Sequence, residues 1–201
     1  MDKIISETAN FFEEMTACFG DLSQFEQNIL QIAQLANIDL AKLEIDHVAV
    51  RMNSLEKAEK WRAFLLRNAK LLKESKVNGR PIGLFLLPYS LDLCGQPVPI
   101  LELPFPKGKA YPQEGWEHVE AVFPMLETEN TAQWIARTLA TFNLTEHPDL
   151  ALKISQPEVE GERLPNPTIA ITVKNATFCN HSCLKLHPYG INDIIRSESD
   201  F

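Results

Sequence analysis

The stretch Ile45-Asp46-His47-Val48-Ala49-Val50-Arg51 has a near copy at Trp116-Glu117-His118-Val119-Glu120-Ala121-Val122. In each, an acidic residue precedes a histidine, a valine follows it, and a run typical of a half-buried strand continues. His47 and His118 are 71 residues apart, which is long enough for one supersecondary module. The repeat predicts a chain built twice from one plan, with its two histidines meeting at one site.

The composition indicates a protein with an ordinary core and excludes several classes of partner. The chain has 201 residues, of which 45% are hydrophobic, so it can bury a core without disulfides or metals. Its formal charge of −8 argues against nucleic acid, because phosphate binding needs a basic face. No apolar run approaches the roughly 18 residues that span a bilayer. The N-terminus lacks the features of a secretory signal, and the four cysteines are too scattered for a disulfide framework. We expect a cytoplasmic protein with no nucleic-acid or membrane partner.

The order of the expected elements repeats along the chain. Residues 2–37 predict a pair of helices separated by Gly20, with Asp21 as the cap of the second helix. Strand, helix and further strands then follow twice, on either side of a linker at 104–112. The first set is expected at 44–52, 54–72 (a helix capped by Ser54), 82–91 and 97–104; the second is expected at 116–125, 130–142, 168–174 and 178–187, with a loop rich in proline and charge at 147–166.

Three residues on the expected strands have the donor atoms of a metal site. Side chains alternate between the faces of a strand, so His47 shares a face with Arg51, and His118 shares one with Glu120. Glu102 lies among apolar neighbours, and a buried carboxylate needs a cationic or metal partner. Two histidines and a carboxylate are the ligands of a facial triad, which leaves open positions on an iron-like or other divalent ion.

Two charged residues near this triad each have two interpretations. Glu120 is either a general base beside His118 or the partner of Arg51 in an ion pair, and we favour the ion pair. Arg51 is alternatively an anion clamp, because its guanidinium fork suits a carboxylate or a phosphate.

The last expected strand does not repeat the carboxylate of the first half. Superposing residues 100–104 on 183–187 places Lys185 opposite Glu102. A protonated lysine cannot bind a metal ion, so Lys185 is a candidate for holding an anionic substrate. His187 lies on the same face, about 6.5–7 Å further along, where it is a candidate fourth ligand.

A separate zinc site is a weaker interpretation of the same region. Its ligands would be Cys179, His181, Cys183 and His187. An extended chain from 179 to 187 covers roughly 26 Å, so the four side chains reach one ion only if the chain folds sharply.

Six segments between about residues 44 and 195 carry a resemblance to a known superfamily: Asp46-His47-Val48-Ala49-Val50-Arg51, Asn78-Gly79-Arg80-Pro81, Glu102-Leu103-Pro104, Gly115-Trp116-Glu117-His118-Val119-Glu120, Glu162-Arg163-Leu164-Pro165-Asn166-Pro167 and Lys185-Leu186-His187-Pro188. The chain resembles the vicinal oxygen chelate superfamily, which contains glyoxalases, extradiol dioxygenases and metal-dependent resistance enzymes. Within it, the chain is similar to the small bacterial YecM-like family. The superfamily pattern has a carboxylate where Lys185 stands, so this chain departs from a four-ligand site.

The resemblance implies an α+β fold in which two βαβββ modules form a curved mixed sheet around a cleft. It implies an N-terminal helical pair at 1–40 and a vicinal-oxygen-chelate-like domain at 41–201. Within that domain, module one is expected at about 44–106 and module two at about 115–195.

The resemblance also implies a divalent-metal-dependent enzyme, an isomerase, lyase or dioxygenase, that acts on a small, anionic, oxygen-chelating substrate. The ion would be Fe, Mn, Ni or Zn. The expected residues are His47, Glu102, His118 and His187 for the metal, Glu120 as catalytic base, and Arg51 and Lys185 for the substrate.

Three alternatives stay open. The first is a metal-free protein that sequesters a small ligand in the same cleft, with Lys185 offsetting the charge of Glu102. The second is an interaction module whose N-terminal helical pair docks a partner. The third concerns assembly: the modules pair within one chain or are exchanged in a homodimer.

Overall fold

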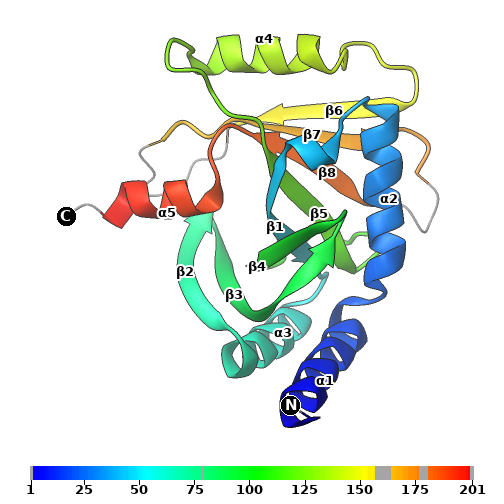
Figure 1. Ribbon diagram of the computed structural model, residues 1–201, viewed down its shortest axis with the longest axis vertical. Coiled ribbons are helices and arrows are strands. Elements are labelled where there is room, and N and C mark those ends of the chain that lie inside the picture. Colours follow the sequence, from blue (N-terminus) through cyan, green and yellow to red (C-terminus); the bar gives the residue numbers. More distant parts are fainter. Residues whose placement is uncertain (1, 78, 157–163, 177–180, 200–201) are drawn as a thin grey trace.

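One mixed sheet of eight strands connects the two halves of the molecule, in the order β2-β3-β4-β1-β5-β8-β7-β6 (Figure 1). The computed structural model describes residues 2–77, 79–156, 164–176 and 181–199. The helices are α1 (Asp2–Phe19), α2 (Leu22–Leu35), α3 (Leu55–Asn68), α4 (Thr131–Thr141) and α5 (Ile191–Ser199), with a short 3-10 helix η1 (Leu40–Lys42). The strands are β1 (Glu44–Arg51), β2 (Lys70–Val77), β3 (Arg80–Leu93), β4 (Gln96–Pro104), β5 (Gly115–Val122), β6 (Leu150–Ser155), β7 (Thr168–Val173) and β8 (Cys183–His187).

The sheet consists of two modules with the same connection. The first is β1-α3-β2-β3-β4 and the second is β5-α4-β6-β7-β8. In each module the first strand lies parallel to the last, and the remaining neighbours are antiparallel. Strand β1 pairs antiparallel with β5, which joins the halves within one chain. The α+β class and the two βαβββ modules are therefore confirmed.

The helices begin and end where the sequence provides caps. Gly20 ends α1 with a φ of 91°, a left-handed conformation that glycine adopts without strain. Asp21 caps α2 by accepting hydrogen bonds from the backbone N–H groups of Ser23 and Gln24. Ser54 caps α3 in the same way, and Asn130 forms a capping box with Gln133 at the start of α4. All of these ends agree with the sequence-based expectations.

Two strands and one helix were not predicted. Strand β2 begins in the last three residues of an expected helix and continues through residues for which no element was expected. Strand β6 lies in the segment that was expected to be a loop. These are the two edge strands of the sheet, and an edge strand tolerates charged residues because only one side is paired. Helix α5 follows the last strand and has only nine residues.

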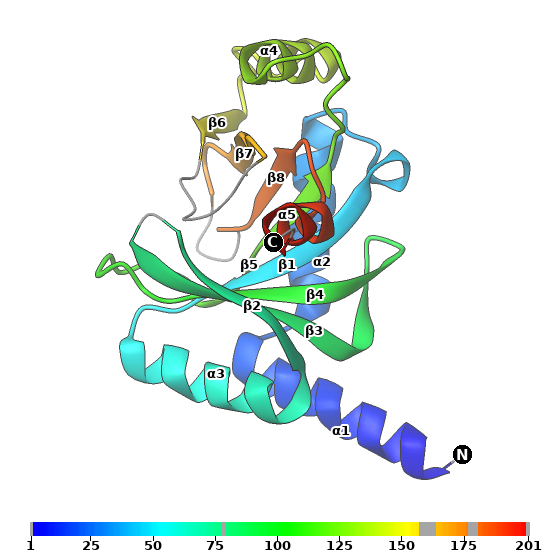
Figure 2. The same cartoon turned by 90° about the vertical axis from the view of Figure 1, so that its left-hand side faces the viewer.

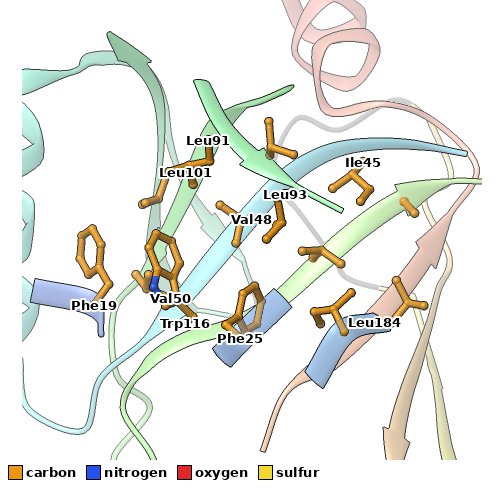
Figure 3. Packing of buried hydrophobic residues seen from close by; sticks show 14 of the residues in the cluster. Phe19, Phe25, Ile45, Val48, Val50, Leu91, Leu93, Leu101, Trp116 and Leu184 are labelled. Atoms are coloured by element: carbon orange, nitrogen blue, oxygen red, sulfur yellow. The ribbon is translucent and has the colours of Figure 1, made fainter. Parts of the chain in front are cut away.

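The hydrophobic core lies on the face of the sheet that α1, α2 and α3 cover. Figure 3 shows Phe19 and Phe25 packed around Trp116, beside Val48 and Val50 of β1. The Trp116 indole donates to the carbonyl oxygen of Gly20 at 3.0 Å, which fixes the corner between α1 and α2 on β5. The buried aromatic side chains each contribute roughly 1.5–3 kcal/mol. Both N-terminal helices therefore share one core with the sheet.

Gly115 permits the closest contact in this core. A Cβ atom at Gly115 would lie 2.2 Å from the carbonyl oxygen of Phe19, and the residue has a φ of 103°. Only glycine satisfies both conditions at the start of β5.

The other face of the sheet faces α5. Figure 2 shows α5 on the opposite side of β2, β3 and β4 from α1 and α3. No helix in the described part of the chain has both the length and the apolar character needed to cross a membrane.

Candidate metal and substrate site

The concave face of the sheet encloses a cavity of about 670 Å³. Its walls consist of alternate residues of the strands, as expected when one face of a sheet lines a cavity. Both modules contribute, and α5 closes one side. The lining side chains include Lys73, Ser75 and Val77 of β2, Arg80, Ile82 and Leu84 of β3, Ala151, Lys153 and Ser155 of β6, Thr168, Ala170 and Thr172 of β7, and Ile191, Ile194 and Ile195 of α5.

Three potential metal ligands meet at the buried end of this cavity. His47 is on β1, Glu102 on β4 and His118 on β5, and their ligand atoms all lie within 4.8 Å of one another. The Nε2 atom of His47 is 3.8 Å from the Glu102 carboxylate, and the Nε2 atom of His118 is 3.9 Å from it. Because β1 pairs with both β4 and β5, Ala49 lies opposite both Glu102 and His118. The sheet register therefore assembles the group.

An acidic residue before each histidine orients its ring. In a regular strand, adjacent side chains point to opposite faces. The pairing of β1 with β5 shifts at Asp46 and again at Glu117, and each shift brings the acidic side chain to the histidine that follows it. The Asp46 carboxylate lies 2.9 Å from Nδ1 of His47, and the Glu117 carboxylate lies 3.4 Å from Nδ1 of His118. The Asp46 contact is a hydrogen bond, the usual arrangement of a metal-binding histidine, whereas the Glu117 contact is electrostatic only. The Nε2 atoms of both rings lie toward Glu102.

Asp46 also anchors helix α5 and His187. Its second carboxylate oxygen accepts the backbone N–H of Ile191 at 2.5 Å, at the start of α5. His187 is fully buried, with Nε2 at 3.3 Å from Asp46 and Nδ1 at 3.3 Å from Glu120. Burial raises the pKa of Asp46, but the charges of His47 and His187 outweigh it and hold that pKa well below its usual value.

Glu120 and Lys185 form a buried ion pair beside the three ligands. They lie opposite each other on the parallel strands β5 and β8, and Lys185 Nζ donates to Glu120 at 2.8 Å. Nζ is also 2.9 Å from Nε2 of His118, which accepts only when its proton is on Nδ1. Burial raises the pKa of Glu120, but Lys185 and His47 lower it well below its usual value. Burial lowers the pKa of Lys185, but Glu120 and Glu102 raise it overall.

The electrostatic field at the site favours a cation. Burial lowers the pKa of His47, yet Asp46, Glu120 and Glu102 together raise it to about 9. At that pKa, His47 is protonated near neutral pH in the metal-free chain, and a bound metal ion would displace this proton. With the histidines then neutral, the four carboxylates of Asp46, Glu102, Glu117 and Glu120 face the two cations Arg51 and Lys185. The formal charge of this group is −2, which one divalent ion would balance.

The ion pair that we favoured between Glu120 and Arg51 is wrong. The Arg51 guanidinium lies 3.3 Å from Glu117, donates to the carbonyl oxygen of Gln113 and stacks 4.6 Å above the ring of Tyr111. The shift in strand pairing at Glu117 places the Glu117 carboxylate within reach of Arg51. Glu120 forms its ion pair with Lys185 instead.

The expected fourth ligand, His187, and the described residues of the alternative zinc site lie outside the group of three ligands. His187 is not among the three grouped ligands; it lies behind them, against Asp46 and Glu120. In the alternative zinc site, Cys179 lies outside the described residues. Cys183 is buried, and burial raises the pKa of its thiol to about 12, so the thiol is protonated in the metal-free chain.

We did not predict that Asp46 and Glu117 contact the ring of the histidine that follows each of them. The sequence does contain a signal for this role, because both acidic residues are part of the repeat that predicts the fold.

Comparison with known proteins identifies the family of the chain. The model of the YecM protein family matches residues 14–198. An uncharacterised protein of Haemophilus influenzae is 45% identical over 93% of this chain and 96% of its own length. Protein YecM of Escherichia coli is 34% identical over 92% of this chain and 95% of its own length. A solved structure of protein EC4020 is similar with a TM-score of 0.74 and 32% identity, over 94% of this chain and 93% of that one. The chain therefore belongs to the YecM family.

Proposed function

We propose that this protein is a divalent-metal-dependent enzyme whose ion is held by His47, Glu102 and His118. The observation that carries the proposal is the approach of these three ligand atoms to within 4.8 Å of one another, at the buried end of a cavity. Two histidines and one carboxylate leave other positions on an ion open to a substrate.

The residues present fit such an ion. The Nε2 atom of His47 is buried and has no hydrogen-bond partner among the described residues, although it lies between two carboxylates. A buried polar atom without a partner is costly, and a metal ion would satisfy it. The formal charge of −2 around it supports an ion of charge +2, but it does not distinguish among Fe, Mn, Ni and Zn.

The neighbouring side chains would bind and position a small substrate. A bound ion would supply Lewis-acid stabilisation of charge on substrate oxygens. Glu120 is ionised near neutral pH because its pKa lies well below the usual value, and Lys185 holds it in place at 2.8 Å. The low pKa makes Glu120 a weak proton acceptor, so a role as base would require a substrate that draws Lys185 away from it. Helix α5, whose isoleucine side chains line the cavity, would exclude water from the reacting group.

The test is metal analysis of protein purified without chelator and then exposed to each divalent ion. We expect one ion per chain in the wild type and none in Glu102→Gln, which keeps the shape of the side chain and removes its charge. Glu44→Gln, at the exposed start of β1, is the matched control and should bind like the wild type. A wild type that binds no divalent ion even at excess contradicts the proposal.

One observation favours a second candidate, a metal-free ligand-binding protein. The Lys185 ammonium group already lies against His118 and Glu120, where it could offset the negative charge without an ion. In that case, replacing both His47 and His118 with alanine would destabilise the protein, and added metal would change the melting temperature of the wild type little.

A further inference from the structure

The cavity is lined by basic side chains that have no role in the proposed metal site. The chain has a formal charge of −8, yet seven of the cavity-lining residues are basic and three are acidic. Arg51 and Lys185 pair with two of those acidic residues, Glu117 and Glu120, near the buried end. The other five basic residues are Lys73, Arg80, Lys107, Lys109 and Lys153.

Three of these five lie close together and come from both halves of the molecule. Arg80 begins β3, Lys107 follows β4, and Lys153 is on β6 of the second module. Arg80 donates to the carbonyl oxygen of Phe105, two residues before Lys107, and all three cations line the same cavity. The pKa of Lys107 is lowered by burial and further by the positive charges of Arg80 and Lys153. Lys107 and Lys153 are exposed, which places the group toward the open end of the cavity.

These three cations have no carboxylate partner in the part of the chain that the structure describes. Arg80 donates through Nη1 to the carbonyl oxygen of Phe105 at 3.4 Å, while its Nε is buried and unpartnered. Like charges brought together without a counter-ion repel one another unless an anion joins them. The arrangement is therefore that of an anion site.

The surroundings suit a phosphate group. Lysine and arginine side chains recognise phosphate through charge-assisted hydrogen bonds, and a phosphate monoester brings close to two negative charges. Hydroxyl groups of Ser75, Ser155 and Thr168 line the same walls and can donate further hydrogen bonds. A volume of about 670 Å³ is that of a site for a small molecule.

We propose that Arg80, Lys107 and Lys153 bind the phosphate group of a small phosphate monoester, whose other end carries the oxygens directed at His47, Glu102 and His118. The placement of that second end rests on the proposed metal-dependent function. The phosphate site itself rests only on the three cations and the walls around them. The substrate spans the cavity from its cationic opening to its acidic, histidine-lined end.

The test is calorimetric titration of inorganic phosphate into the full chain at fixed ionic strength, once with chelator and once with Mn²⁺ present. The key variant is Arg80→Gln/Lys107→Gln/Lys153→Gln. Its control is Lys60→Gln/Arg67→Gln/Lys70→Gln, which removes the same charge from exposed positions outside the cavity. We expect the key variant to bind phosphate at least about tenfold more weakly than the wild type under both conditions, and the control to be unchanged within about twofold.

Three results would overturn the proposal: a wild type that does not bind phosphate, a key variant that binds like the wild type, or an equal loss in the control. If the triple variant does not fold, Lys107→Gln/Lys153→Gln at two exposed positions replaces it. Titration of Mn²⁺ alone separates the two proposals. A wild type that binds phosphate but no divalent ion contradicts the metal-dependent function and leaves the phosphate site intact.

Discussion

The two modules share a fold but differ in the chemistry that their strands present. In the first, Ala49 of β1 lies opposite Glu102 of β4; in the second, Glu120 of β5 lies opposite Lys185 of β8. Glu102 and Lys185 therefore hold equivalent positions, as do Ala49 and Glu120. In the first module the carboxylate, Glu102, is on the last strand. In the second module the carboxylate, Glu120, is on the first strand, and Lys185 is on the last strand. The two modules have the same plan, and the difference in this one strand pair gives the site two unlike sides.

Both modules contribute an equivalent histidine, and replacing either one should have the largest effect on the binding of a divalent ion. His47→Ala and His118→Ala should each weaken divalent-ion binding by about a hundredfold or more, because each removes one of three ligands. Calorimetric titration with Mn²⁺ measures the loss. His147→Ala, in the loop before β6, is the control and should bind like the wild type. If either ligand variant keeps wild-type affinity, the histidines are not equivalent ligands.

The asymmetric part is Lys185, and Lys185→Met separates the two candidate functions. The change leaves the Glu120 carboxylate buried without its cation, and loss of one partner of such a pair costs about 3–5 kcal/mol. Chemical denaturation of chelated protein should show this loss. A divalent ion should then raise the melting temperature of Lys185→Met more than that of the wild type, because the ion replaces the missing charge. Lys153→Met is the matched control. No difference in the metal-induced shift would favour the metal-free alternative.

The two orienting carboxylates allow a finer comparison. Asp46 lies 2.9 Å from Nδ1 of its histidine, and Glu117 lies 3.4 Å from Nδ1 of the other. Asp46→Asn should weaken Mn²⁺ binding by about 10–100-fold, the usual effect of such partners, and Glu117→Gln by less. Titration of both variants gives the ranking. An equal or reversed ranking would mean that the contact distance does not set the effect.

The smallest effect concerns the contact that joins the modules near α3. Glu114 pairs with Lys57 and accepts the backbone N–H of Asn53 at 2.7 Å. Burial raises the pKa of Glu114, but these hydrogen bonds lower it overall. Because the folded pKa lies below the unfolded one, the stabilisation is present above the unfolded value of about 4.5 and is lost as the pH falls through the folded value.

Glu114→Gln should therefore cost about 1 kcal/mol or less at pH 7, since the pair is partly exposed. The difference from the wild type in urea denaturation should shrink as the pH falls below about 4.5. A difference that is independent of pH would show that the Glu114 charge does not contribute.

The sequence predicts the parts of this molecule that local rules determine. The caps Asp21 and Ser54 and the repeat around His47 and His118 each depend on neighbouring residues, and the structure confirms where they lie. Strands β2 and β6 were missed because their charged edge positions do not follow a clear alternation.

The side-chain pairing at the site was less predictable. Alternation alone predicts that Glu117 points away from His118, and only the shift in pairing with β1 brings it to Arg51. The same holds for Asp46 and His47. A shift of register depends on the partner strand, which local sequence does not describe. The cationic group at the cavity opening combines residues from both modules and becomes visible only in the folded chain.

The most direct test of the metal site is anomalous scattering from crystals soaked in Mn²⁺ or Zn²⁺. The account predicts one strong peak between His47 and His118, within bonding distance of Glu102, and no peak there in Glu102→Gln crystals. Wild-type crystals without a peak at that position, at an ion concentration that saturates other sites, would contradict it.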